Sequence, residues 1–77
     1  MRVMTQTFKE MWDEERAPYT QVEFARKLGF TQAYVSLIDL NRRLPSKVLV
    51  NRITRRMDKE RRTEWHRAAA RACGWEV

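Results

Sequence analysis

Two helix starts and one helix end lie within residues 20–31, and this spacing constrains the fold more than any other feature of the chain. Thr20 with Glu23 three residues later is the pattern of a capping box, in which each side chain bonds an otherwise unpaired backbone N–H. Gly29 suits the left-handed end of that helix, and Thr31 suits the cap of the next helix. We therefore expect two short helices, at about 20–29 and 32–40, that are tightly joined and cross steeply.

The remainder of the chain also has the pattern of helices. The 77 residues contain only two glycines and two prolines, and no strand-like alternation of apolar and polar residues is present. Apolar residues recur every three or four positions, as in an amphipathic helix. The sequence predicts an all-α fold of four or five short helices in one small domain, 1–77.

The limits of the other helices follow from similar signals. The first is expected at roughly Gln6–Glu15, closed by Pro18, and Ser46 and Asp58 suit the caps of two later helices. No glycine or proline separates Ser46 from Gly74, so one long helix is the alternative there. We prefer two helices, the second at about 59–73, because Asp58 provides a fresh cap.

The net positive charge comes from one part of the chain, residues 31–77. Lys and Arg number 16 against 10 Asp and Glu, which gives a formal charge of +6 and a pI near 10.3. Residues 1–30 hold five basic and five acidic side chains, whereas residues 31–77 hold eleven basic and five acidic ones. This distribution favours a polyanionic partner such as nucleic acid, and a solvated basic surface is the alternative.

Several classes of protein lack support in this sequence. His66 and Cys73 are the only residues of their kinds, so no metal-site spacing, catalytic triad or intrachain disulfide is expected. We expect no enzyme activity, no metal and no cofactor. The sequence also lacks an apolar run long enough for a membrane span or a signal peptide. We expect a cytoplasmic protein without a membrane partner.

The segment Thr20–Pro45, TQVEFARKLGFTQAYVSLIDLNRRLP, resembles the helix-turn-helix of the phage repressor and Cro family, often called the XRE family. The shared features are Thr-Gln, an alanine four residues after the glutamine, a glycine, a second Thr-Gln, Val-Ser, Ile-Asp and Arg-x-Pro. Physical reasons support the pattern separately. Ala25 suits a close helix crossing, and Val35 and Ile38 fall on one side of the second helix, which leaves the other side free.

This resemblance implies sequence-specific binding of double-stranded DNA, with helix 32–40 in the major groove and no cofactor. Gln32 is the first candidate for reading bases, because its amide can pair with adenine N6 and N7. Ala33, Ser36 and Leu37 occupy the other reading positions. The expected backbone or bracing residues are Gln21, Thr31, Tyr34, Arg42, Arg43 and Lys47, and Tyr34 is equally well interpreted as a bystander.

Two departures from the family pattern lie at the end of helix 32–40. Asn41 replaces the usual glycine, which is harmless because asparagine tolerates left-handed geometry. Leu37 and Leu40 replace polar residues. We expect Leu37 to contact thymine methyl groups, with a protein-binding surface as the alternative, and Leu40 to fold under the following loop with Leu44.

The resulting hypothesis is a Cro-like transcriptional repressor of phage or mobile-element type, located at the nucleoid when bound to DNA. A single reading helix contacts few base pairs, so a homodimer on an inverted-repeat operator is expected. The C-terminal segment offers candidate dimer contacts, namely Trp65, Ala69, Ala72, Trp75 and Val77. The alternative function is an antitoxin or accessory regulator whose helix-turn-helix domain mainly binds a protein partner.

Overall fold

The computed structural model describes residues 6–75, and its regular structure there is entirely helical. The five helices are α1 (Phe8–Arg16), α2 (Gln21–Leu28), α3 (Gln32–Asp39), α4 (Lys47–Thr54) and α5 (Lys59–Cys73). The all-α prediction is confirmed, including the separation of α4 from α5. No helix in the described part of the chain is long and apolar enough to cross a membrane.

Side-chain caps determine where each helix begins. The predicted caps Thr20, Thr31, Ser46 and Asp58 all accept a backbone hydrogen bond from the residue three positions later. The expected start of α1 at Gln6 was wrong. Thr7 and Glu10 form a second capping box, so the helix begins only at Phe8.

Three helices end in a left-handed residue. Gly29, Asn41 and Gly74 have φ values of 76°, 58° and 73°. After each of them, the next backbone N–H bonds a carbonyl oxygen five residues back, as in Arg42 to Leu37 at 2.9 Å. Asn41 therefore ends α3 as a glycine would, in agreement with its predicted tolerance of this geometry.

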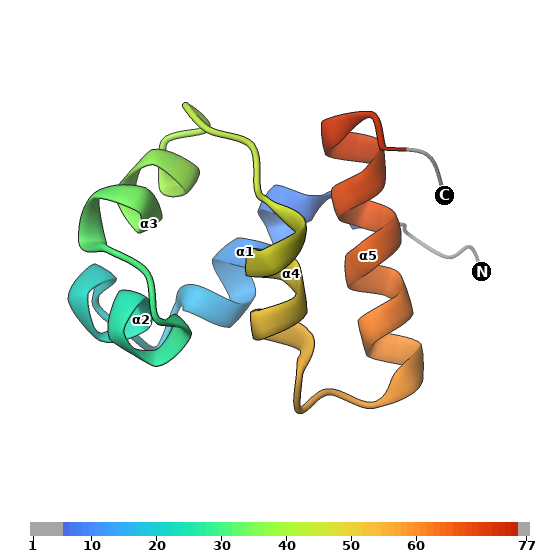
Figure 1. Cartoon of the computed structure of the whole chain (residues 1–77), viewed down its shortest axis with the longest axis horizontal. Helices are drawn as coiled ribbons and strands as arrows, with labels where there is room; N and C mark the ends of the chain where they lie inside the picture. The colour runs from blue at the N-terminus through green and yellow to red at the C-terminus, as the bar shows by residue number, and fades with distance from the viewer. Residues whose placement is uncertain (1–5, 76–77) are drawn as a thin grey trace.

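All five helices contribute to one apolar core. α2 packs against α3 and α4, while α5 packs against α1 and α4. In Figure 1, α3 lies at one end of the long axis and α5 at the other. The buried core residues are Phe8, Met11, Trp12, Phe24, Ala25, Leu28, Val35, Ile38, Leu49, Val50, Ile53, Trp65, Ala68 and Ala69.

The predicted dimer contacts on α5 need correction. Trp65 and Ala69 are completely buried within the chain, so neither can contact a second copy. Ala72 is exposed and Trp75 is half-buried against the core. Val77 lies outside the described residues. Sequence periodicity predicts an apolar stripe of Trp65, Ala68, Ala69 and Ala72 on α5. The first three are buried against α1 and α4, whereas Ala72 is exposed and Ala70 is buried instead.

Gly29 occupies a more restricted site than Gly74, although both are left-handed. A Cβ atom at Gly29 would lie 2.8 Å from Nη1 of Arg52, whereas a Cβ at Gly74 would meet nothing within 4 Å. Arg52 is held there because Nη1 donates hydrogen bonds to the carbonyl oxygens of Leu28 and Gly29, at 3.0 and 3.1 Å. Gly29 is thus needed for its left-handed conformation, and a larger residue would also have to move the end of the Arg52 side chain from its two carbonyl partners.

Gly29→Ala is therefore expected to lower the free energy of unfolding by about 2 kcal/mol, roughly half from left-handed strain and half from displacing Arg52. Gly74→Ala is the matched control and should cost only the strain, about 1 kcal/mol. Urea denaturation of both variants measures the difference. Equal losses would show that Arg52 moves aside without cost.

Candidate nucleic-acid interface

α3 has one buried side and one accessible side. Val35 and Ile38 are fully buried against the core, as predicted. Gln32 and Ala33 are exposed, and Ser36 and Leu37 are half-buried. The four predicted base-reading residues thus share the side of the helix that the rest of the protein leaves uncovered.

Hydrogen bonds link Gln32 directly to Gln21 and, through Gln21, to Asp39. Nε2 of Gln32 donates to Oε1 of Gln21 at 3.4 Å. Nε2 of Gln21 in turn donates to Oδ2 of Asp39 at 2.9 Å. The three side chains form a chain that runs from the last residue of α3, through the first residue of α2, back to the first residue of α3.

Asp39 is the anchor of this chain. Its Oδ1 accepts from Nε1 of Trp12 at 2.6 Å, and its Oδ2 also accepts from Nε of Arg16 at 2.7 Å. The Asp39 side chain is only 15% exposed. Burial acts to raise the pKa of Asp39, but the hydrogen bonds from Trp12, Gln21 and Arg16 and the charge of Arg16 outweigh it, so the pKa lies below its ordinary value.

The Asp39 carboxylate also fixes the orientation of the side-chain amides of Gln21 and Gln32. An ionised carboxylate only accepts hydrogen bonds, so Gln21 must direct its NH₂ group towards Asp39 and its carbonyl oxygen towards Gln32. Gln32 must then direct its own NH₂ group towards Gln21. The carbonyl oxygen of Gln32 and one of its N–H donors remain available to an outside partner.

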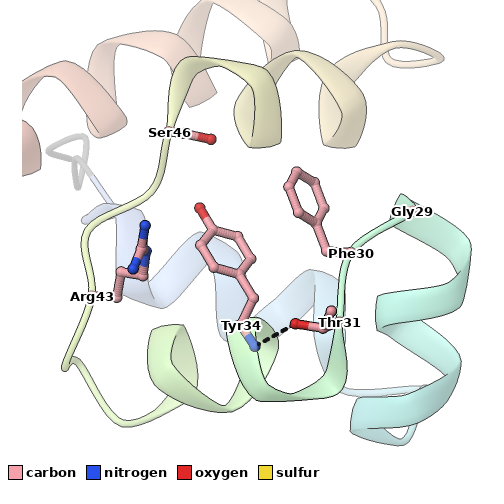
Figure 2. Close-up of a pocket in the computed structure, with 6 residues that line it drawn as sticks. All are labelled: Gly29, Phe30, Thr31, Tyr34, Arg43 and Ser46. Atoms are coloured by element: carbon pink, nitrogen blue, oxygen red, sulfur yellow. Dashed lines mark hydrogen bonds between the residues drawn. The ribbon is translucent and has the colours of Figure 1, made fainter.

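A row of stacked groups lies beside the start of α3. The rings of Phe30 and Tyr34 stack with centroids 4.9 Å apart, Arg43 lies over Tyr34 at 5.3 Å and Arg52 lies over Phe30 at 4.9 Å. Figure 2 shows Tyr34 between Arg43 and Phe30, with its hydroxyl directed towards the start of α4. Phe30, Tyr34 and Arg43 also line a surface hollow, together with Thr31 and Ser46.

The remaining predicted contacts surround this hollow or follow α3. Thr31 caps α3 by accepting from the backbone N–H of Tyr34 at 3.1 Å, so its hydroxyl already has a structural task. Arg42 and Arg43 are exposed in the loop after α3. Lys47 begins α4 and places its Nζ over the ring of Trp75, 5.5 Å from the centroid. Thr31, Arg42 and Arg43 therefore lie next to α3, whereas the Lys47 side chain is directed to Trp75 after the end of α5.

Leu40 and Leu44 do not fold under the loop, contrary to the expectation. They are 62% and 60% exposed, and Val48 on α4 is 53% exposed. The left-handed turn at Asn41 directs the chain away from α3 before it reaches the buried Pro45. Two large apolar side chains therefore border the candidate interface rather than the core.

The roles of Asp39, Arg16 and Trp12 were missed from the sequence. One signal was available for Asp39. An acidic residue in the last turn of a helix faces the negative end of the helix dipole, which is unfavourable unless a cation or several donors compensate. The identity of those donors was not readable, because Trp12 and Arg16 lie 27 and 23 residues away.

The accessible side of α3, its oriented amide and the arginines beyond it have the chemistry of a surface that binds nucleic acid. Comparisons of this chain with protein-family models, with curated proteins and with solved structures find no match. A function is therefore inferred from the chain's own residues.

Proposed function

We propose that this chain is a sequence-specific DNA-binding transcriptional regulator of the Cro-like helix-turn-helix type. The observation that carries the proposal is the Gln32 amide, exposed at the start of α3 and oriented through Gln21 and Asp39. Its free carbonyl oxygen and N–H match the N6 donor and N7 acceptor of adenine in the major groove. In this arrangement α3 is the reading helix and α2 lies across the backbone.

Affinity in this proposal comes from the residues around α3. Arg42 and Arg43 are exposed cations that would contact phosphate oxygens, and Lys47 would do so after leaving the ring of Trp75. Arg43 is partly ordered by its contact with Tyr34, which lowers the entropy lost when it binds. Ser36 and Leu37 lie on the same side of α3 as Gln32, and Leu37 is suited to a thymine methyl group.

Regulation by occlusion of a promoter is the simplest mode of action for such a domain, which would act in the cytoplasm at the nucleoid. Two copies related by a two-fold axis would read half-sites about 34–36 Å apart. The surface that joins the copies does not include Trp65 or Ala69, because both are buried in the core.

The proposal is tested by selecting binding sites from a random duplex library at about 150 mM salt, where nonspecific phosphate binding is weak. An inverted repeat is expected to be enriched. Gln32→Ala should then weaken binding to the enriched site by about 5- to 150-fold, since a bidentate amide–adenine pair contributes roughly 1–3 kcal/mol. The loss should vanish when the contacted adenine is replaced.

Gln6→Ala is the control, because it removes a glutamine amide that bonds Glu14 on α1 rather than the α2–α3 chain. It should leave affinity within about twofold of the unaltered protein. A library that yields no enriched sequence would contradict specific DNA recognition. A second candidate function is an antitoxin or accessory regulator that mainly binds a protein partner. The observation that supports it is the exposure of three large apolar side chains, Leu40, Leu44 and Val48.

A further inference from the structure

A basic stripe follows one face of α5, at the end of the molecule away from α3. Lys59, Arg62, Thr63, His66 and Arg67 together line a surface hollow. Their spacing is i, i+3, i+4, i+7 and i+8, which places all five on one side of a helix. We call this set the α5 stripe.

The cations of the α5 stripe are not neutralised by neighbours. Among the described ion pairs, none involves Lys59, Arg62 or Arg67. Arg61, which lies off the stripe, instead pairs with Glu14 at 3.5 Å and Glu64 at 3.4 Å. Glu14 and Glu64 therefore pair with Arg61, Asp58 caps the helix, and Glu60 is in no described ion pair, so the three stripe cations are left without a close carboxylate.

Helix stability does not account for this arrangement. Lys59 and Arg62 lie in the first turn of α5, where the positive end of the helix dipole disfavours cations. All three cations are exposed, so none fills the core. A binding role explains why positive charge is concentrated at a position that weakens the helix.

The α5 stripe and the reading side of α3 belong to helices at opposite ends of the molecule. α5 buries Trp65, Ala68 and Ala69 against α1 and α4, so its stripe faces outward at one end of the long axis. α3 lies at the other end (Figure 1). The molecule is 37 Å long, so the two surfaces are well separated and each can face a different duplex.

We propose that the α5 stripe binds the phosphate backbone of a second DNA duplex, so that one protomer can bridge two segments. Duplex DNA is favoured over an acidic protein because the stripe has no exposed aromatic or aliphatic side chain. Protein interfaces usually combine Arg with aromatic or apolar anchors, whereas Lys, Arg and Thr without such anchors are the usual phosphate contacts. The stripe's affinity for duplex does not depend on the proposed sequence recognition by α3, but bridging does.

The length of the stripe defines the expected footprint. Lys59 and Arg67 are eight residues apart, which is about 12 Å along a helix. The three cations therefore contact about three phosphates of one backbone. Neutralising them should reduce the slope of log affinity against log salt by about 2.7, since each phosphate contact contributes about 0.9.

The test first removes the α3 site with Gln32→Ala, Arg42→Gln, Arg43→Gln and Lys47→Gln. Binding of this variant to a random-sequence duplex is measured by fluorescence anisotropy at about 50–200 mM salt. Adding Lys59→Gln, Arg62→Gln and Arg67→Gln should lower affinity about tenfold or more. The control adds Arg26→Gln, Arg55→Gln and Arg56→Gln instead, which removes equal charge from other exposed positions, and should change affinity less than about threefold.

In the otherwise unaltered protein, a bead-bound duplex with the enriched site should capture a second, labelled duplex. The three stripe substitutions should abolish capture and leave affinity for a single enriched site within about twofold. Equal losses in stripe and control variants, or capture that survives the stripe substitutions, would overturn the proposal. Stripe-dependent binding of polyglutamate without binding of duplex would also overturn it in favour of an acidic protein.

The two proposals fail separately. If no site is enriched but duplex binding by the α3-altered protein still depends on the stripe, sequence recognition is wrong and the stripe's duplex affinity stands. A site may instead be enriched, with Gln32→Ala lowering affinity for it and the stripe substitutions changing nothing. In that case only the proposal that the α5 stripe binds duplex DNA is wrong. Circular dichroism verifies that each variant retains its helices, and glutamine is a good helix former at all three stripe positions.

Discussion

Trp65→Ala is expected to lower the free energy of unfolding by about 3–5 kcal/mol, which is most of the stability available to a domain of this size. Trp65 is completely buried, and its ring meets that of Phe8 edge to face with centroids 5.7 Å apart. Removing the indole leaves a large cavity between α5 and α1. The variant should be largely unfolded at room temperature, as measured by circular dichroism and urea denaturation.

Trp65→Phe is the matched variant. It keeps an aromatic ring and removes Nε1, a buried donor that has no hydrogen-bond partner among the described residues. The lost contact area is partly offset by the removal of this unsatisfied group, so the expected cost is about 1 kcal/mol. A dimer-contact role for Trp65 would instead make the midpoint of unfolding of the unaltered protein rise with concentration while Trp65→Ala stayed folded as a monomer.

Asp39→Asn is expected to lower the free energy of unfolding by about 3 kcal/mol, because it breaks a largely buried pair with Arg16. The amide has nearly the same volume, but one acceptor oxygen becomes a donor. That NH₂ group must then face either the indole N–H of Trp12 or the donors of Arg16 and Gln21. Thermal and urea unfolding measure the loss.

Asp13→Asn is the control for this prediction. Asp13 pairs with Lys9 at 2.8 Å, but its side chain is 57% exposed. A solvent-exposed pair one helical turn apart contributes little, so this variant should lose no more than about 0.5 kcal/mol. Losses of similar size in the two variants would show that the Asp39 network is not a special source of stability.

The stability lost in Asp39→Asn is expected to depend on pH. The folded-state pKa of Asp39 is lowered from its ordinary value of 3.8, so the ionised group favours the folded state. This contribution is fully present above about pH 4 and is lost as the pH falls through the lower, folded-state pKa. The stability difference between the unaltered protein and Asp39→Asn should therefore shrink below pH 4, whereas a constant difference would contradict the assignment.

Asp39→Asn should also weaken recognition of the enriched DNA site. The amide that this substitution introduces can both donate and accept hydrogen bonds, so either end of the Gln21 amide can face it. The Gln32 amide, which bonds Gln21, then no longer has a single fixed orientation. Discrimination against a replaced adenine should fall in Asp39→Asn and persist in Asp13→Asn. This comparison is made at a temperature where both variants remain folded, so a loss of folding does not imitate a loss of specificity.

Most helix limits were predictable from the sequence because the interactions that set them are local. Thr20 and Glu23 cap each other across three residues, and Gly29 and Asn41 adopt a conformation that few other residues tolerate. The apolar stripes of α1, α2 and α3 were also readable, since periodicity depends only on neighbouring residues. The exposed side of α3 and the position of Gln32 followed directly from these patterns.

Only the tertiary structure determined which residues of different helices contact one another. Periodicity identifies an apolar stripe on α5 but does not tell whether Trp65 packs in its own core or against a second copy, and packing places it in the core. Asp39 meets Trp12 and Arg16 across 27 and 23 residues, and Arg52 reaches the end of α2 across a similar separation. Such contacts depend on how whole helices cross, which is set by the packing of the entire core rather than by any short segment.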